Sequence, residues 1–206
     1  MALLAAGVAF DAFEIVLRHK PHGLLAVSPK GTVPVLVLDD GGVIEESLEI
    51  MRWALHLHAD ETVRTSWQTA QTPENSELIA LNDGSFKQHL DRYKYPEKFA
   101  STDRAADRDA AVLALLEPLE KRLTATAFLG GAQACAADWA IFPFVRQFRA
   151  VDEAWFDAQP LPATQCWLQF WLASALYASC MKKLLPEQRL GFEAQTGSLA
   201  KHEKTA

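Results

Sequence analysis

Two dipeptides with binding chemistry, Val33-Pro34 and Glu46-Ser47, stand on either side of a turn-forming run of aspartate and glycine. Proline cannot donate to a β-ladder, so Pro34 is unusual at the front of a strand. A cis bond would swing the Val33 backbone away from the sheet, and its N–H and C=O could then pair with an extended peptide lying alongside. An ordinary trans proline on an edge strand is the alternative, which the dipeptide alone favours because few X–Pro bonds are cis.

The Glu46-Ser47 pair has the chemistry to hold both charged groups of an amino acid. Ser47 stands where a helix begins and is a good N-cap, and the free N–H groups and positive dipole end of a helix start attract a carboxylate. Glu46, directly before it, can accept a hydrogen bond from an ammonium group. The pair therefore indicates a site for a ligand that carries a carboxylate and an ammonium on one carbon. Ser47 acting only as a cap is the alternative.

A hairpin and a helix must position these dipeptides. Residues 33–38 are rich in strand formers, and Asp39–Gly42 has hairpin-turn composition. A helix follows from Ser47 to about Leu57, with Leu48, Met51 or Ile50, and Leu55 on its apolar side. Upstream we expect a helix over 1–6 that Gly7 stops, a strand over 10–17 and a brief helical turn near 24–27.

The rest of the chain has the periodicity of helices only. Residues 58–72 are polar and poorly periodic, and we interpret them as a linker or excursion. Beyond Pro73 we expect helices near 74–94, 103–126, 136–150 and 162–180, and a short one near 182–190. The predicted organisation is an α/β unit at 1–60, a linker at 61–72 and an all-helical unit at 73–206.

Two stretches resemble the glutathione S-transferase superfamily. The run SPKGTVPVLVLDDGGVIEESLEIMRWAL resembles that family's amino-terminal domain, in which V-P-x-L, a turn and E-S at a helix start follow one another. The run ACAADWAIFPFVRQF resembles a helix start in its carboxyl-terminal domain, and Lys20-Pro21 has the spacing of omega-like members. The resemblance covers residues 1 to about 185. The combination of V-P-x-L with E-S is fairly specific, whereas each half alone is weak.

The resemblance implies a fold, a ligand and roles for individual residues. The fold is α/β plus all-α: a thioredoxin-like N-terminal domain followed by a helical bundle of the glutathione S-transferase type. Pro34 would be a cis proline that presents the Val33 backbone to the cysteinyl part of glutathione. Glu46 and Ser47 would hold the γ-glutamyl group, and Lys20 would reach the glycine carboxylate. A Lys20 that is only a solvated surface lysine is the alternative.

Cys135 marks one departure from the family pattern. Ser or Thr usually stands three residues before the aspartate of the capping box, and here Cys135 precedes Asp138. Cysteine is a weak acceptor, so we expect one half of the box to be poor and the other half, from Asp138 to the Cys135 N–H, to form. The expected cost is a fraction of the roughly 1 kcal/mol that a cap contributes.

The start of the sequence marks a larger departure. In the family, a strand and a turn carrying an activating Cys, Ser or Tyr precede the first helix, and this sequence begins with residues typical of that helix. We therefore expect a domain that lacks its first strand, and we assign no catalytic residue. Two interpretations are open: Met1 is an internal methionine of a longer protein, or the chain is a degenerate, non-catalytic member.

Composition limits the partners and the cellular compartment. The chain has 206 residues, a net charge of −6 and a pI of about 5.5, and it carries no basic stripe, so we expect no nucleic acid partner. No apolar run reaches membrane-spanning length. Cys135, Cys166 and Cys180 form no C-x-x-C motif, which suits a reducing cytoplasm. His56 and His58 point in different directions on a helix, and we expect no metal site.

The aromatic residues of the helical part have two interpretations. The run from Cys166 to Leu172 and the residues Trp139, Phe142 and Phe144 are most simply helix core, or they could wall a cleft for a hydrophobic substrate. The resulting hypothesis is a cytoplasmic, homodimeric glutathione transferase of the omega-like, Cys-type group. It would use glutathione as co-substrate for conjugation to a small electrophile or for thiol exchange with a disulfide. The alternative is a non-catalytic glutathione-fold binding or regulatory protein.

Overall fold

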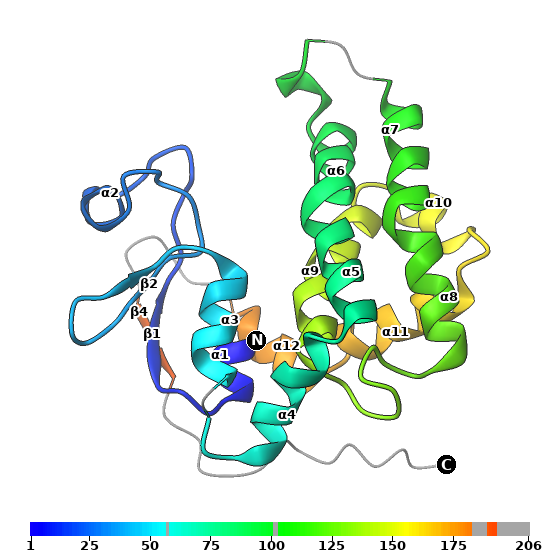
Figure 1. Cartoon of the computed structure of the whole chain (residues 1–206). Helices are drawn as coiled ribbons and strands as arrows, with labels where there is room; N and C mark the ends of the chain where they lie inside the picture. The colour runs from blue at the N-terminus through cyan, green and yellow to red at the C-terminus, as the bar shows by residue number, and fades with distance from the viewer. Residues whose placement is uncertain (57, 101–102, 183–188, 193–206) are drawn as a thin grey trace. The chain divides into compact units, whose positions relative to one another are not determined.

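The structure, a computed structural model, describes residues 1–56, 58–100, 103–182 and 189–192 (Figure 1). The chain forms two compact units. The first, called here the α/β unit, comprises Met1–Trp67 and the described part of the segment that begins at Ala175. The second, called the helical unit, is the continuous stretch Gln68–Ser174. The α/β unit is therefore assembled from both halves of the sequence.

The α/β unit contains short strands and helices. Its elements are α1 (Ala2–Ala5), β1 (Phe10–Phe13), α2 (His22–Val27), β2 (Leu36–Val37), β3 (Val43–Ile44), α3 (Ser47–Leu55), α12 (Ala175–Cys180) and β4 (Arg189–Phe192). Gly7, at φ +64°, ends α1 as predicted, with its N–H donating to the Leu4 carbonyl. Helix α1 packs against α3, and Ile50, Met51 and Leu55 of α3 are buried.

The strands form two separate antiparallel ladders. β2 pairs with β3 through the predicted turn, in which Gly41 has φ +86°. β1 pairs with β4, with Phe10 opposite Phe192 and Phe13 opposite Arg189. Among the described residues, no ladder joins the two pairs.

Two predictions around these strands need correction. The strand predicted over 10–17 ends at Phe13, which pairs with Arg189, the first described residue of β4. Val16 and Leu17 are exposed, and β propensity counts for little in residues that pack against nothing on a sheet face. The helix predicted near 182–190 falls mostly on 183–188, outside the described residues. Its described end, Arg189 and Leu190, belongs to a strand. The tail from Gln195 also lies outside the described residues.

Within the predicted linker at 61–72, Glu61–Ala70 forms helix α4, and the boundary between the two units, after Trp67, falls in the same range. The Asp60 side chain accepts a hydrogen bond from the Thr62 N–H at 2.7 Å, which starts the helix. Val63, Trp67 and Ala70 are buried at positions i, i+4 and i+7. This narrow apolar face is surrounded by polar residues, so its helical period is weak in the sequence.

The helical unit holds the remaining helices. They are α5 (Pro73–Leu81), η1 (Asn82–Phe86), α6 (Lys87–Lys94), η2 (Pro96–Lys98), α7 (Arg104–Ala111), η3 (Val112–Leu116), α8 (Glu117–Ala125), α9 (Ala136–Arg149), α10 (Glu153–Asp157) and α11 (Pro162–Leu172). The predicted helices at 74–94 and 103–126 each form one unbroken helical run that contains a π-helical turn. In the first run η1 lies between α5 and α6, and in the second η3 lies between α7 and α8. Gly84 in η1 leaves helical geometry, at φ −92° and ψ −105°. The predicted helix at 162–180 divides into α11 and α12.

Aromatic side chains fill the core of the helical unit. Trp139, Phe142, Trp167 and Trp171 are all buried, which supports the core interpretation for this set. The rings of Phe142 and Trp167 meet edge to face, with centroids 6.3 Å apart. In the part of the chain that the structure describes, no helix combines the length and apolar character needed to cross a membrane.

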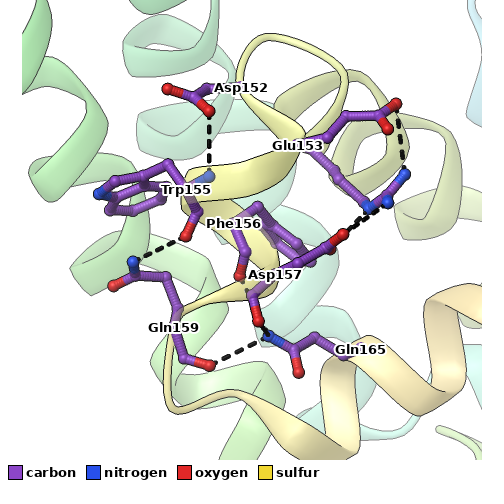
Figure 2. Close-up of polar contacts among 8 residues, drawn as sticks. Asp152, Glu153, Trp155, Phe156, Asp157, Gln159 and Gln165 are labelled. Atoms are coloured by element: carbon purple, nitrogen blue, oxygen red, sulfur yellow. Dashed lines mark hydrogen bonds and ion pairs between the residues drawn. The ribbon is translucent and has the colours of Figure 1, made fainter.

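Helix α10 is tied to its neighbours by side chains that satisfy backbone groups (Figure 2). Asp152 caps it by accepting from the Trp155 N–H at 3.0 Å. The Gln165 side chain of α11 donates to the carbonyls of Phe156 and Gln159, each at 3.0 Å. At the end of α10, Arg149 donates two hydrogen bonds to the Asp157 carboxylate, from Nε to Oδ1 at 2.8 Å and from Nη2 to Oδ2 at 2.7 Å. Short α10 is thus held by tertiary contacts rather than by its own length.

Replacing Asp157 by asparagine should destabilise the protein fully above about pH 4, and progressively less as the pH falls below that value. The hydrogen bond from Arg149 holds the pKa of the Asp157 carboxyl below its ordinary value, so its contribution is present above that value and is lost as the pH falls through the lowered pKa. Because Asp157 is about half exposed, we expect a loss of about 0.5–1 kcal/mol at pH 7. Urea unfolding of the two proteins at several pH values checks this, and a difference that persists at about pH 2 would contradict it.

Candidate functional site

The predicted ligand-binding residues lie on the α/β unit, on the loop before β2 and at the start of α3. The Val33–Pro34 peptide bond is cis. Val33 is about half exposed, and its backbone N–H and C=O have no hydrogen-bond partner among the described residues. The loop therefore presents one donor and one acceptor of the main chain, as the sequence predicted for a strand-like ligand.

Helix α3 begins at Ser47, as predicted, but the residue that caps it differs from the prediction. Glu46, with extended φ −101° and ψ 138°, is the N-cap, and its carbonyl accepts from the Ile50 N–H at 2.9 Å. The prediction that Ser47 caps the helix is therefore wrong, because Ser47 is already the first helical residue. No described residue accepts the N–H groups of Ser47 and Leu48. This first turn offers free donors at the positive end of a nine-residue helix.

Lys20 lies against the loop that leads to Val33. Gly31 adopts the left-handed conformation, with φ +59°. A β-carbon at Gly31 would be 3.0 Å from Leu25 Cδ2 and 3.1 Å from Lys20 Nζ. The ammonium of Lys20 thus lies directly over Gly31, two residues from Val33.

Replacing Gly31 by alanine should lower the free energy of unfolding by about 1–2 kcal/mol. The left-handed conformation is costly for a residue with a β-carbon, and the new methyl group would press on Leu25 and Lys20. Urea unfolding measures the loss. Gly23→Ala in α2 is the matched control, since nothing lies within 4 Å of its β-carbon position. Equal stability of the two variants would contradict the prediction.

Three further residues at the site were not predicted from the sequence. Buried Ser28 donates its hydroxyl to Glu45 Oε1 at 2.6 Å. Lys30 Nζ lies 3.4 Å from Glu45 Oε2 and 3.8 Å from Glu46 Oε1. These contacts join the loop before Val33 to the start of α3. No local pattern announces them, because each depends on a contact between residues far apart in the chain.

Glu45 is the anchored member of this group. The Ser28 hydrogen bond, with a further contribution from Lys30, holds the pKa of Glu45 below its ordinary value, although partial burial opposes the shift. Its side chain is about one quarter exposed, whereas that of Glu46 is 70% exposed. Glu45 is thus an ionised, fixed carboxylate, and Glu46 reaches into solvent.

In the helical unit, the capping box of α9 forms despite its cysteine. Asp138 Oδ2 accepts from the Cys135 N–H at 2.8 Å, which confirms that half of the prediction. Burial, with a smaller contribution from Asp138, raises the pKa of the Cys135 thiol to about 12. A thiol with that pKa has no useful thiolate fraction at neutral pH. Cys135 is therefore a structural residue.

A cavity of about 430 Å³ in the helical unit is lined partly by cations. Lys94 and Arg146 stand in the last turns of α6 and α9, where the helix dipole favours positive charge. Their placement needs no ligand to explain it. Among the described residues, no three His, Cys, Asp or Glu side chains gather as they would around a metal ion.

Family models match both parts of the sequence. Residues 1–57 match the N-terminal domain model of glutathione S-transferase, and residues 100–169 match the C-terminal domain model. None of the curated proteins compared with the chain matches it significantly.

Solved structures of glutathione transferases share the fold. The URE2P6 transferase of Phanerochaete chrysosporium, in complex with oxidized glutathione, has a TM-score of 0.69 and 17% identity, over 86% of each chain. Glutathione S-transferase-I bound with lactoylglutathione has 0.63 and 21%, over 86% of this chain and 88% of its own. A transferase of Xanthobacter autotrophicus Py2 has 0.60 and 22%, over 84% and 85%. The fold is a thioredoxin-like N-terminal domain with a helical C-terminal domain, as predicted.

Proposed function

The chain belongs to the glutathione S-transferase superfamily, and on that basis we propose that its α/β unit binds glutathione as the co-substrate of a transferase. One observation supports this most. The backbone N–H and C=O of Val33 and the first N–H groups of α3 have no partner among the described residues, and the Lys30–Glu46 ion pair joins the two segments that carry them. Glutathione carries matching groups, since it is an extended tripeptide with a carboxylate and an ammonium at its γ-glutamyl end.

Each part of glutathione has a counterpart in the site. The cysteinyl backbone would pair with Val33, next to cis Pro34. The γ-glutamyl carboxylate would accept from the Ser47 hydroxyl and the first-turn N–H groups, and its ammonium would donate to Glu46. Lys20, lying over Gly31, would meet the glycine carboxylate. All of these residues lie within the α/β unit.

The reaction we propose is conjugation of glutathione to a small electrophile or thiol exchange with a disulfide, in an omega-like protein of the Cys-type. The group that activates the glutathione thiol is not assigned to a residue of this sequence, because Cys135 is buried and its thiol has a raised pKa. We further propose a homodimer in the cytoplasm, where the three cysteines, all free in the structure, would stay reduced. Light scattering of the purified protein tests the dimer.

Isothermal titration with reduced glutathione tests the binding. We expect saturable binding and retention on glutathione-agarose, with release by free glutathione. Turnover is then measured with an aryl halide and with a glutathione mixed disulfide. Retention without turnover would favour the second candidate, a non-catalytic glutathione-binding protein. Failure to bind at millimolar glutathione would refute both.

A further inference from the structure

Lys30 places a cation of the protein beside the carboxylate that we assign to the ligand's ammonium. Its Nζ lies 3.8 Å from Glu46 Oε1 and 3.4 Å from Glu45 Oε2. An ammonium on a flexible stem can move between two such acceptors at little cost. In the absence of ligand, Glu46 therefore already has a positively charged partner from its own chain.

The two carboxylates differ in how they are held. Glu45 is fixed by buried Ser28 at 2.6 Å and is only about one quarter exposed. Glu46 has no such anchor among the described residues, and its side chain is mostly exposed. A ligand entering at the start of α3 would meet Glu46 first, while Lys30 could remain with Glu45.

We propose that Lys30 competes with the ligand's ammonium for Glu46, and that Glu45 is a positioning residue that draws Lys30 away from it. This inference rests on the proposed binding of glutathione. Binding then exchanges one ammonium for another at Glu46, and Lys30 keeps a carboxylate partner throughout. The affinity for glutathione is thereby set partly by a residue that does not contact it.

The opposite role of Lys30 is also physically reasonable and predicts the opposite result. Glutathione has two carboxylates and one ammonium, so a nearby lysine could attract it by charge alone. Removing Lys30 would then weaken binding. The sign of the change separates the two roles.

The experiment is a double-mutant cycle measured by isothermal titration with glutathione. Lys30→Met should tighten binding about two- to fivefold, and Glu45→Gln should weaken it about two- to fivefold, the range expected for exposed ion pairs. The double variant should bind as tightly as Lys30→Met, because Glu45 matters only while Lys30 is present. Arg52→Met is the matched control, since Arg52 has the same 60% side-chain exposure and pairs with Glu49 in α3.

Two outcomes would overturn the inference. Lys30→Met could weaken binding, or the loss in Glu45→Gln could persist in the double variant, which would mean that Glu45 acts only by holding Ser28 and the loop. A second readout does not depend on glutathione: the NMR signal of the Lys30 side chain should shift in both Glu45→Gln and Glu46→Gln. A shift in Glu45→Gln alone would refute the competition. Absence of glutathione binding in the wild type, with both shifts seen, would refute the proposed function and leave the pairing of Lys30 intact.

Discussion

Replacing Asp138 by alanine should lower the free energy of unfolding by about 3–5 kcal/mol. The Asp138 carboxylate is fully buried and accepts three N–H groups: Leu129 at 3.1 Å, Cys135 at 2.8 Å and the Trp167 indole at 2.7 Å. Burial raises the pKa of Asp138, and these donors oppose the rise. Alanine would leave all three donors buried without an acceptor, at about 1–3 kcal/mol each before the structure relaxes.

Urea unfolding measures this loss, and two further variants keep the prediction testable. Asp138→Asn retains one acceptor oxygen and should have an intermediate free energy of unfolding. The loss can therefore be measured with this variant even where the alanine variant does not fold. Asp109→Ala is the control, since Asp109 is exposed in the same unit and pairs with its neighbour Arg108. An alanine variant at position 138 within about 1 kcal/mol of the wild type would show that the donors find other partners.

Replacing Glu46 by alanine should weaken glutathione binding about tenfold to a hundredfold. A hydrogen bond between an ammonium and a carboxylate contributes about 1.5–3 kcal/mol, and each 1.4 kcal/mol changes the dissociation constant tenfold. Because the Glu46 side chain is largely exposed, pairs only weakly with Lys30 at 3.8 Å and caps the helix through its backbone, the stability of the variant should stay near that of the wild type.

Isothermal titration measures the affinity, and thermal unfolding measures the stability. Glu49→Ala is the matched control, because Glu49 belongs to the same helix and its carboxylate pairs with Arg52 at 2.6 Å. A loss below about twofold for Glu46→Ala would mean that the ammonium of glutathione binds elsewhere.

The residues of the candidate site could be predicted from the sequence only where they belong to a motif of neighbouring residues. The valine–proline and glutamate–serine pairs were recognised because the family repeats them at this spacing. The contacts from Ser28 and Lys30 to Glu45 were not, since they join the loop to the start of α3 through the folded structure. The predicted start of α3 at Ser47 is confirmed, and only its cap was misassigned: serine caps well, but the extended backbone at Glu46 makes that residue the N-cap.

The errors in the fold have a common physical origin. Helix α4 was missed because its buried face has only three apolar residues, and α10 because a five-residue helix depends on Asp152 and Gln165 for its stability. β1 was predicted too long because β propensity is a weak guide for side chains that stay exposed, as those of Val16 and Leu17 do. The long helix α9, with its wide apolar face, was predicted closely over 136–150 because burial and period agree there.

The ladder between Phe10–Phe13 and Arg189–Phe192 has a practical consequence for making this protein. A recombinant product that stops at Ser174 would lose β4 and leave one side of β1 bare. Bare β edges recruit strands from other molecules, so such a product should tend to aggregate. The region from Gln68 to Ser174 is a single uninterrupted piece of gene, whereas the two segments of the α/β unit lie on either side of it and would have to be joined by a linker or supplied as two chains.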